Sequence, residues 1–77
     1  MIQIIHFDSL NKSGLSKDVI SIYQSTDKVK KYIQDILDGA IFPPIKLYKN
    51  TTTIADGIHR ICAYLFLEIK EYEYNYY

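Results

Sequence analysis

The feature that most constrains this fold is the spacing of apolar residues, which changes from helical to strand-like along the chain. Two segments, 29–37 and 58–65, repeat apolar residues every three or four positions, which places them on one face of an amphipathic helix. Residues 69–76 alternate with a period of two, which is typical of a β-strand. The predicted helical faces are Val29, Tyr32, Ile33, Ile36 and Leu37 in the first segment and Ile58, Ile61, Cys62 and Leu65 in the second.

Capping residues predict where the helices begin and end. A short additional helix is expected to follow Ser16 and to bury Val19, Ile22 and Tyr23. For the helix over 29–37, a side-chain cap is expected just before the apolar face and a left-handed glycine just after it. The candidates are Ser25, Thr26 or Asp27 at the start and Gly39 at the end.

Short runs of β-branched and aromatic residues predict three more strands, at 2–7, 45–48 and 52–55. Pro43 and Pro44 cannot lie inside a central strand, but they can stiffen the entry to one. The expected order is strand, two helices, two strands, helix and strand. We therefore predict an α+β fold with a small mixed sheet and helices packed on it.

Length and charge narrow the class of protein. The chain has 77 residues, so we expect a single domain over 1–77 with a shallow site rather than a deep one. Nine basic residues balance nine acidic ones, so DNA binding is not expected. No segment has the roughly 18 consecutive apolar residues of a membrane span, and no secretory signal is evident. With a single cysteine, the expected location is the cytoplasm.

The candidate functional residues are in the turn "ADGIHR", ahead of the last helix. Asp56 is expected to cap this helix, and Gly57 to allow a sharp turn. His59 and Arg60, the chain's one arginine, fall outside the apolar face. A helix N-terminus carries unpaired N–H groups and partial positive charge, so a cation there becomes favourable when an anion binds. The alternative is a capped helix whose histidine and arginine are solvated or pair with acidic residues of the last strand.

These residues resemble the ParB N-terminal-like superfamily, which includes sulfiredoxin, over about residue 29 to the end. The shared pattern is a Pro-Pro-hydrophobic strand, a turn, a second strand, a D-G-x-H-R turn, a helix and a last strand. The matching residues are Pro43, Pro44, Ile45, Ile54, Asp56, Gly57, His59, Arg60 and Ala63. The resemblance implies a ParB/sulfiredoxin-like domain in which Gly57, His59 and Arg60 contact the phosphates of ATP or another nucleotide, with or without Mg²⁺. Asp56 would cap the helix or reach a metal or a hydroxyl.

Departures from the family pattern limit what the resemblance implies. Ile58 stands where sulfiredoxin has its reactive cysteine, and a branched alkane is not a nucleophile. Cys62 lies one turn further on, in the predicted buried face. The chain is also too short for the DNA-binding helices of ParB proteins. Two functions remain: a nucleotide-binding domain, with or without slow hydrolysis or transfer, and a catalytically inactive protein-binding module, such as a phage or plasmid inhibitor of a host or defence protein.

The C-terminal tyrosines suggest where a protein partner would bind. Tyr72, Tyr74 and Tyr76 share one face of the predicted last strand, and tyrosine is enriched at interface hot spots. The expected partner is another protein or a second copy that contacts this strand. No histidine or cysteine pair has ligand spacing, so no metal site held by the protein alone is expected.

Overall fold

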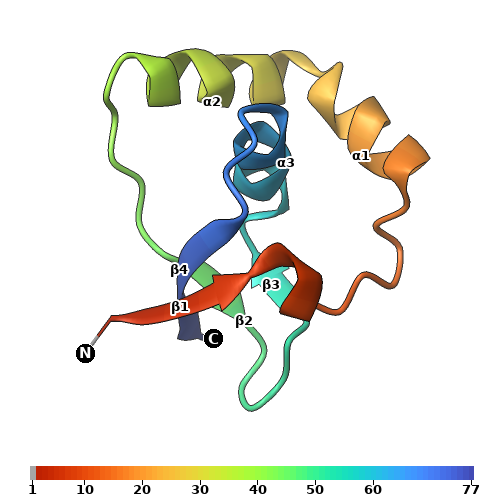
Figure 1. Cartoon of the computed structure of the whole chain (residues 1–77), viewed down its shortest axis with the longest axis vertical. Helices are drawn as coiled ribbons and strands as arrows, with labels where there is room; N and C mark the ends of the chain where they lie inside the picture. Colours follow the sequence, from red (N-terminus) through yellow and green to blue (C-terminus); the bar gives the residue numbers. More distant parts are fainter. Residues whose placement is uncertain (1) are drawn as a thin grey trace.

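The arrangement of strands and helices is known from a computed structural model that describes residues 2–77. Over those residues, the chain forms three α-helices and a four-stranded mixed sheet, which is the predicted α+β class (Figure 1). The elements are β1 (Gln3–His6), a 3₁₀ turn (Phe7–Ser9), α1 (Lys17–Gln24), α2 (Asp27–Leu37), β2 (Ile45–Leu47), β3 (Ile54–Asp56), α3 (Ile58–Phe66) and β4 (Glu71–Tyr76). Their order agrees with the predicted order. Each predicted strand is one to three residues longer than the observed strand or is shifted from it along the sequence.

The last strand of the chain lies inside the sheet. The strand order is β1-β4-β2-β3, with β4 antiparallel to β1 and parallel to β2. The pairing continues past the strand, where the Tyr77 N–H donates to the Leu47 carbonyl oxygen at 2.6 Å. β4 pairs with β1 over residues 71–74 on one edge and with β2 over residues 74–76 on the other, so the edge strands of the sheet are β1 and β3.

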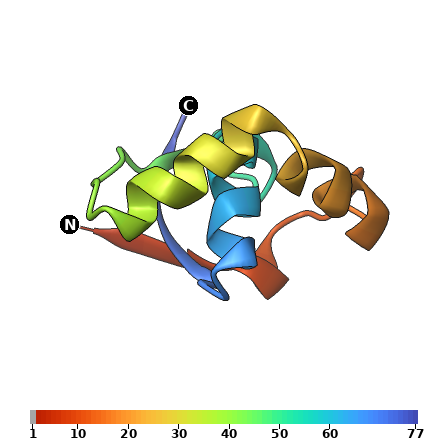
Figure 2. The same ribbon diagram turned by 90° about the horizontal axis from the view of Figure 1, so that it is seen from above.

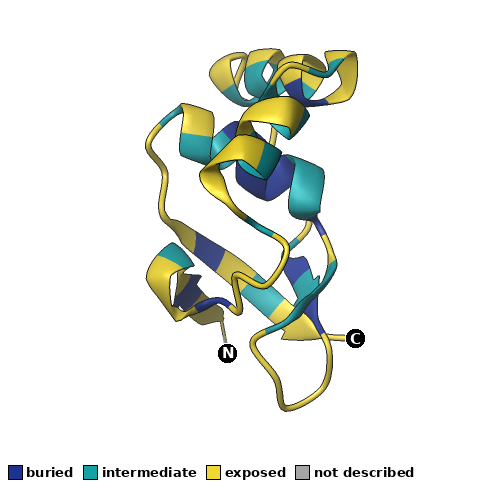
Figure 3. Ribbon diagram, turned by 90° about the vertical axis from the view of Figure 1, so that its right-hand side faces the viewer, coloured by how far each residue is buried: buried dark blue, intermediate teal, exposed yellow. Residues whose placement is uncertain are grey.

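Helix α3 forms the middle layer between the sheet and the other two helices. Figure 2, seen from above, shows α2 crossing over α3, with the strands on the far side. Toward the sheet, Ile61 packs against Ile45 and Leu47, and toward α2, Cys62 and Ala63 pack against Val29. Figure 3 shows that burial is concentrated around this middle layer. Each fully buried branched side chain contributes about 1.5–3 kcal/mol, so α3 provides much of the stabilisation.

The first two helices have the predicted kind of cap, and α3 does not. The side-chain oxygens of Ser16 and Thr26 accept from backbone N–H groups three residues further on. The prediction that Asp56 caps α3 is wrong, because Asp56 is the last residue of β3, paired with Lys46. The N-cap is Gly57, which provides no side chain, so no side-chain cap is found for α3 in the described chain.

Three predicted burial positions are also wrong. Ile22 and Leu37 are 66% and 64% exposed, because they lie at the edges of faces whose centres contact α3. Tyr72 is only 3% exposed, since its ring packs under α3, so it cannot belong to the partner surface predicted from the tyrosine row. Tyr74 is half-buried, and Tyr76 is 41% exposed.

Candidate functional site

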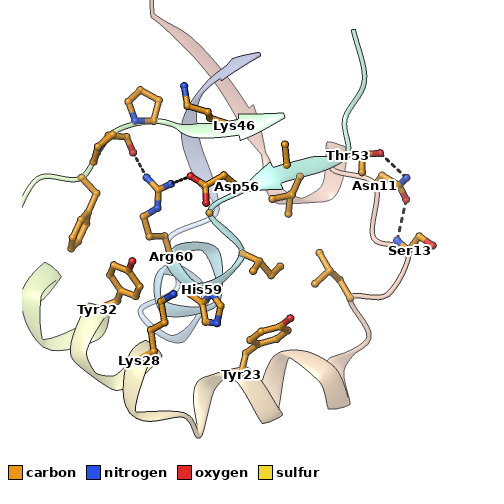
Figure 4. A pocket seen from close by; sticks show the side chains of 18 residues that line it. Asn11, Ser13, Tyr23, Lys28, Tyr32, Lys46, Thr53, Asp56, His59 and Arg60 are labelled. Atoms are coloured by element: carbon orange, nitrogen blue, oxygen red, sulfur yellow. Dashed lines mark hydrogen bonds and ion pairs between the residues drawn. The ribbon is translucent and has the colours of Figure 1, made fainter. Parts of the chain in front are cut away.

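The predicted turn lines a cleft where all three helices and the sheet edge meet. The cleft has a volume of about 770 Å³ and opens between the start of α3, strands β2 and β3, and the junction of α1 with α2 (Figure 4). A loop from the 3₁₀ turn closes one end, where Asn11 donates to the Thr53 hydroxyl at 3.0 Å. The polar and aromatic lining residues are Asn11, Ser13, Tyr23, Lys28, Tyr32, Phe42, Lys46, Thr53, Asp56, His59 and Arg60.

Arg60 is buried rather than solvated, and it does not pair with the acidic residues of β4. It is 8% exposed, and its guanidinium lies between two elements that converge at the cleft (Figure 4). Nη1 donates to the Pro43 carbonyl oxygen, and Nη2 donates to Asp56 Oδ2 at 3.4 Å. An arginine is suited to this position because its rigid fork can serve a carbonyl and a carboxylate together. Arg60 therefore ties α3 to the segment before β2 and to the end of β3.

Gly57 is required by the backbone and by the available space. Its φ is +112°, a conformation that L side chains rarely adopt. A Cβ added there would lie 2.8 Å from Ile45 Cγ2, well inside van der Waals contact. Packing alone thus accounts for this glycine.

The first turn of α3 presents its backbone donors at the cleft. Among residues 2–77, no hydrogen bond is found for the N–H groups of Ile58, His59 and Arg60, and the first intrahelical bond runs from Ile61 to the Gly57 carbonyl at 2.9 Å. Such donors carry the partial positive charge of the helix end. Without a side-chain cap, they can accept an anion in its place.

His59 is the residue of the turn that no structural role fully explains. Its ring stands edge-on to Tyr23 of α1, with centroids 5.1 Å apart and planes at 89°. Partial burial, followed by the charge of Lys28, lowers the pKa of His59 below its usual value. At neutral pH the cleft therefore presents a neutral imidazole near the ammonium group of Lys28.

Two lysines of the cleft were missed by the sequence-based site prediction. Lys28 is in the first turn of α2, and Lys46 extends from β2 above Asp56 (Figure 4). A cation in the first turn of a helix opposes the helix dipole, so Lys28 carried the same signal as Arg60. No sequence pattern marks Lys46 as a site residue, because the other residues that line the cleft with it are distant in sequence.

The charge of the lining is positive. Two lysines and one arginine stand against a single carboxylate, that of Asp56, and His59 adds a fourth basic group when protonated. One carboxylate is enough to support a Mg²⁺ ion that a phosphate ligand carries, but not to hold one alone. No group of three or more potential metal ligands is found within the described part of the chain.

The chain's thiol lies away from this chemistry. Cys62 is fully buried between α3 and α2, and burial raises its pKa to about 11. A thiol in that state is a small apolar side chain rather than a nucleophile, as its place in the apolar face predicted.

No helix within residues 2–77 has the length and apolar character needed to cross a membrane. Comparisons with protein-family models, curated proteins and solved structures found no match to this chain.

Proposed function

We propose that this domain binds a nucleotide through its phosphates in the cleft at the start of α3. The observation that carries the proposal is a cleft lined both by three basic side chains, from α2, β2 and α3, and by a helix N-terminus that has no cap. Uncapped backbone donors and basic side chains together form the usual environment of a bound phosphate. The resemblance of the D-G-x-H-R turn to nucleotide-binding domains supports the same proposal.

In this proposal, the residues of the cleft have different roles in binding the phosphates. The N–H groups of the first turn and the side chains of Lys28, Lys46 and His59 would contact the phosphates. Arg60 would attract the phosphates through its charge without direct contact, because its guanidinium is hydrogen-bonded to Pro43 and Asp56. In this proposal Gly57 shapes the turn and makes no specific contact of its own beyond the backbone.

The size and aromatic lining of the cleft favour a nucleotide over inorganic phosphate. A volume of about 770 Å³ lies within the range of small-molecule sites. Tyr23 lies against His59, and Tyr32 forms an edge-to-face pair with Phe42 at 5.2 Å. Aromatic side chains can stack with any base, so they would hold the base without selecting it strongly.

Isothermal titration calorimetry with ATP, ADP, CTP and GTP, each with and without Mg²⁺, tests the proposal. Lys28→Ala and Lys46→Ala should each weaken binding about tenfold, the loss of one charge-assisted contact. Lys30→Ala, on the same helix as Lys28 but outside the cleft, is the matched control and should bind normally. No binding at millimolar nucleotide, or equal loss in all three variants, would refute the proposal.

A second candidate is the protein-binding module, which the exposed tyrosines near the C-terminus favour. Tyr48 and Tyr77 form an edge-on pair at 6.1 Å, and Tyr74 and Tyr76 form another at 5.7 Å. Tyr48, Tyr76 and Tyr77 are at least 41% exposed. If the protein acts through a partner alone, Tyr76→Ala with Tyr77→Ala should abolish its cellular effect while Lys28→Ala with Lys46→Ala leaves that effect unchanged.

A further inference from the structure

The two edge strands of the sheet differ in how open they are to pairing with another strand. β3 has three residues, ends at the charged Asp56, and has a register shift in its pairing with β2. Short length, charge and irregular pairing are features that protect a sheet edge. β1, drawn in red in Figure 1, is longer and contains no lysine, carboxylate or proline. The edge at β1 therefore lacks the protection that β3 has.

The backbone of β1 has hydrogen-bonding groups that point away from the sheet. The Phe7 N–H donates to the Lys70 carbonyl oxygen at 2.7 Å, in the same antiparallel register that pairs β1 with β4. Along such a strand, residues alternate between bonding to the neighbouring strand and pointing away from it. Gln3, Ile5 and Phe7 thus bond toward β4, and the N–H and C=O groups of Ile4 point to the open edge. Such groups are a template for another strand.

The side chains at this edge leave apolar surface exposed. Ile5 is opposite the buried Tyr72, so its side chain lies on the face of the sheet under α3. Ile4 is opposite Glu73, lies on the other face, and is 59% exposed. Ile2 comes two residues earlier, which is the spacing of residues on one face of a strand, and it is 69% exposed. Free backbone groups and exposed isoleucines thus occur on the same edge strand.

We propose that a second copy of this chain pairs with β1 in antiparallel orientation, about a twofold axis at Ile4. The Ile4 N–H of each copy would donate to the Ile4 carbonyl oxygen of the other copy. Ile2 would lie opposite His6 of the second copy, and Gln3 opposite Ile5. A second copy is favoured because the edge is complementary to itself: isoleucine meets isoleucine at the axis, and no like charges lie opposite each other.

The proposed dimer leaves the cleft at the start of α3 open in both copies. The order β1-β4-β2-β3 places β1 at the opposite edge of the sheet from β3, and no residue of β1 lines the cleft. The inference is therefore independent of the nucleotide proposal. It also differs from the sequence-based expectation of a second copy at the last strand, since β4 lies inside the sheet and β1 is at its edge.

Sedimentation equilibrium of the full chain without nucleotide, from about 10 µM to about 1 mM protein, tests the inference. Because the pairing is short, we expect a weak dimer with a dissociation constant on the order of 100 µM. Ile4→Lys places two ammonium groups opposite each other at the axis and should weaken the dimer at least about tenfold. Ile41→Lys is the matched control and should leave the constant unchanged, because Ile41 is 96% exposed and lies outside β1.

Amide hydrogen exchange of the natural chain locates the interface without any substitution. The Ile4 N–H should exchange at least about threefold more slowly at 1 mM than at 10 µM, in proportion to the loss of monomer. Three results would overturn the inference: equal effects of Ile4→Lys and Ile41→Lys, a dimer in which Ile4 exchange does not depend on concentration, and a chain that is monomeric at about 1 mM. In the last case the second copy is wrong, and the edge is left to a strand of a different protein.

Discussion

Replacing Gly57 with alanine tests the packing of the turn that opens the cleft. Two costs add at this position. An L-residue at φ +112° is strained by roughly 1–3 kcal/mol, and a Cβ placed 2.8 Å from Ile45 Cγ2 forces a shift in a core side chain that is 1% exposed, at about 1–3 kcal/mol. The lower entropy of the unfolded alanine chain returns about 0.4–1 kcal/mol. The expected net loss is therefore about 1–6 kcal/mol, from a total stability of roughly 4–12 kcal/mol at this length.

Gly14 and Gly39 allow the cost of backbone strain to be measured apart from the cost of the steric contact. Gly14 and Gly39 also have positive φ, at +78° and +88°, but an added Cβ would meet nothing within 4 Å at either. Gly14→Ala and Gly39→Ala should thus lose only the backbone strain. Urea unfolding followed by circular dichroism provides the comparison, and each kcal/mol shifts the midpoint by about 0.5–1 M.

The close contact between a Cβ at position 57 and Ile45 can be tested by changing Ile45. Ile45→Leu removes the Cγ2 atom that the new Cβ would strike, so Gly57→Ala should cost less in that background than in the natural chain. If Gly57→Ala is no more destabilising than Gly39→Ala, or if Ile45→Leu leaves its cost unchanged, the close contact is not what requires glycine.

Three further predictions concern the residues of the cleft and the thiol. Arg60→Lys should destabilise the fold by about 1–3 kcal/mol in urea unfolding, since a lysine cannot serve both acceptors; an unchanged midpoint would show that Arg60 is not a structural tie. Because the pKa of His59 is lowered in the folded chain, first by burial and then by Lys28, its contribution to stability is lost as pH falls below about 6.5. His59→Gln should therefore reduce the drop in unfolding midpoint between pH 8 and pH 5.5, and an identical drop would contradict the assignment. With a pKa of about 11, Cys62 should react with iodoacetamide at pH 8 at least about tenfold faster in urea than in the native state, as mass spectrometry can measure.

Local features of the chain were predictable because they depend on neighbouring residues. Ser16 and Thr26 cap their helices through contacts only three residues away, and the alternating tail forms the predicted strand. The burial of Arg60 was not predictable, since its acceptor at Pro43 is 17 residues away and is brought near only by the folded sheet. The same holds for Tyr72, because alternation shows that tyrosines share a face but not how far α3 extends over that face.

This distinction changes the weight of the D-G-x-H-R turn as evidence for a ligand. Gly57 is explained by its contact with Ile45, and Arg60 by its two acceptors, so both would be required in a domain of this fold that bound nothing. Asp56 is one of those acceptors. What folding does not explain is a histidine and two lysines from three separate elements that line the same cleft as an uncapped helix end, where burial first and the charge of Lys28 second lower the pKa of His59. Perturbed pKa values tend to cluster at functional sites. The stronger evidence for an anionic ligand is therefore the presence of Lys28, Lys46 and His59 in the lining of one cleft, and variants at these positions discriminate binding from folding where a variant of Arg60 cannot.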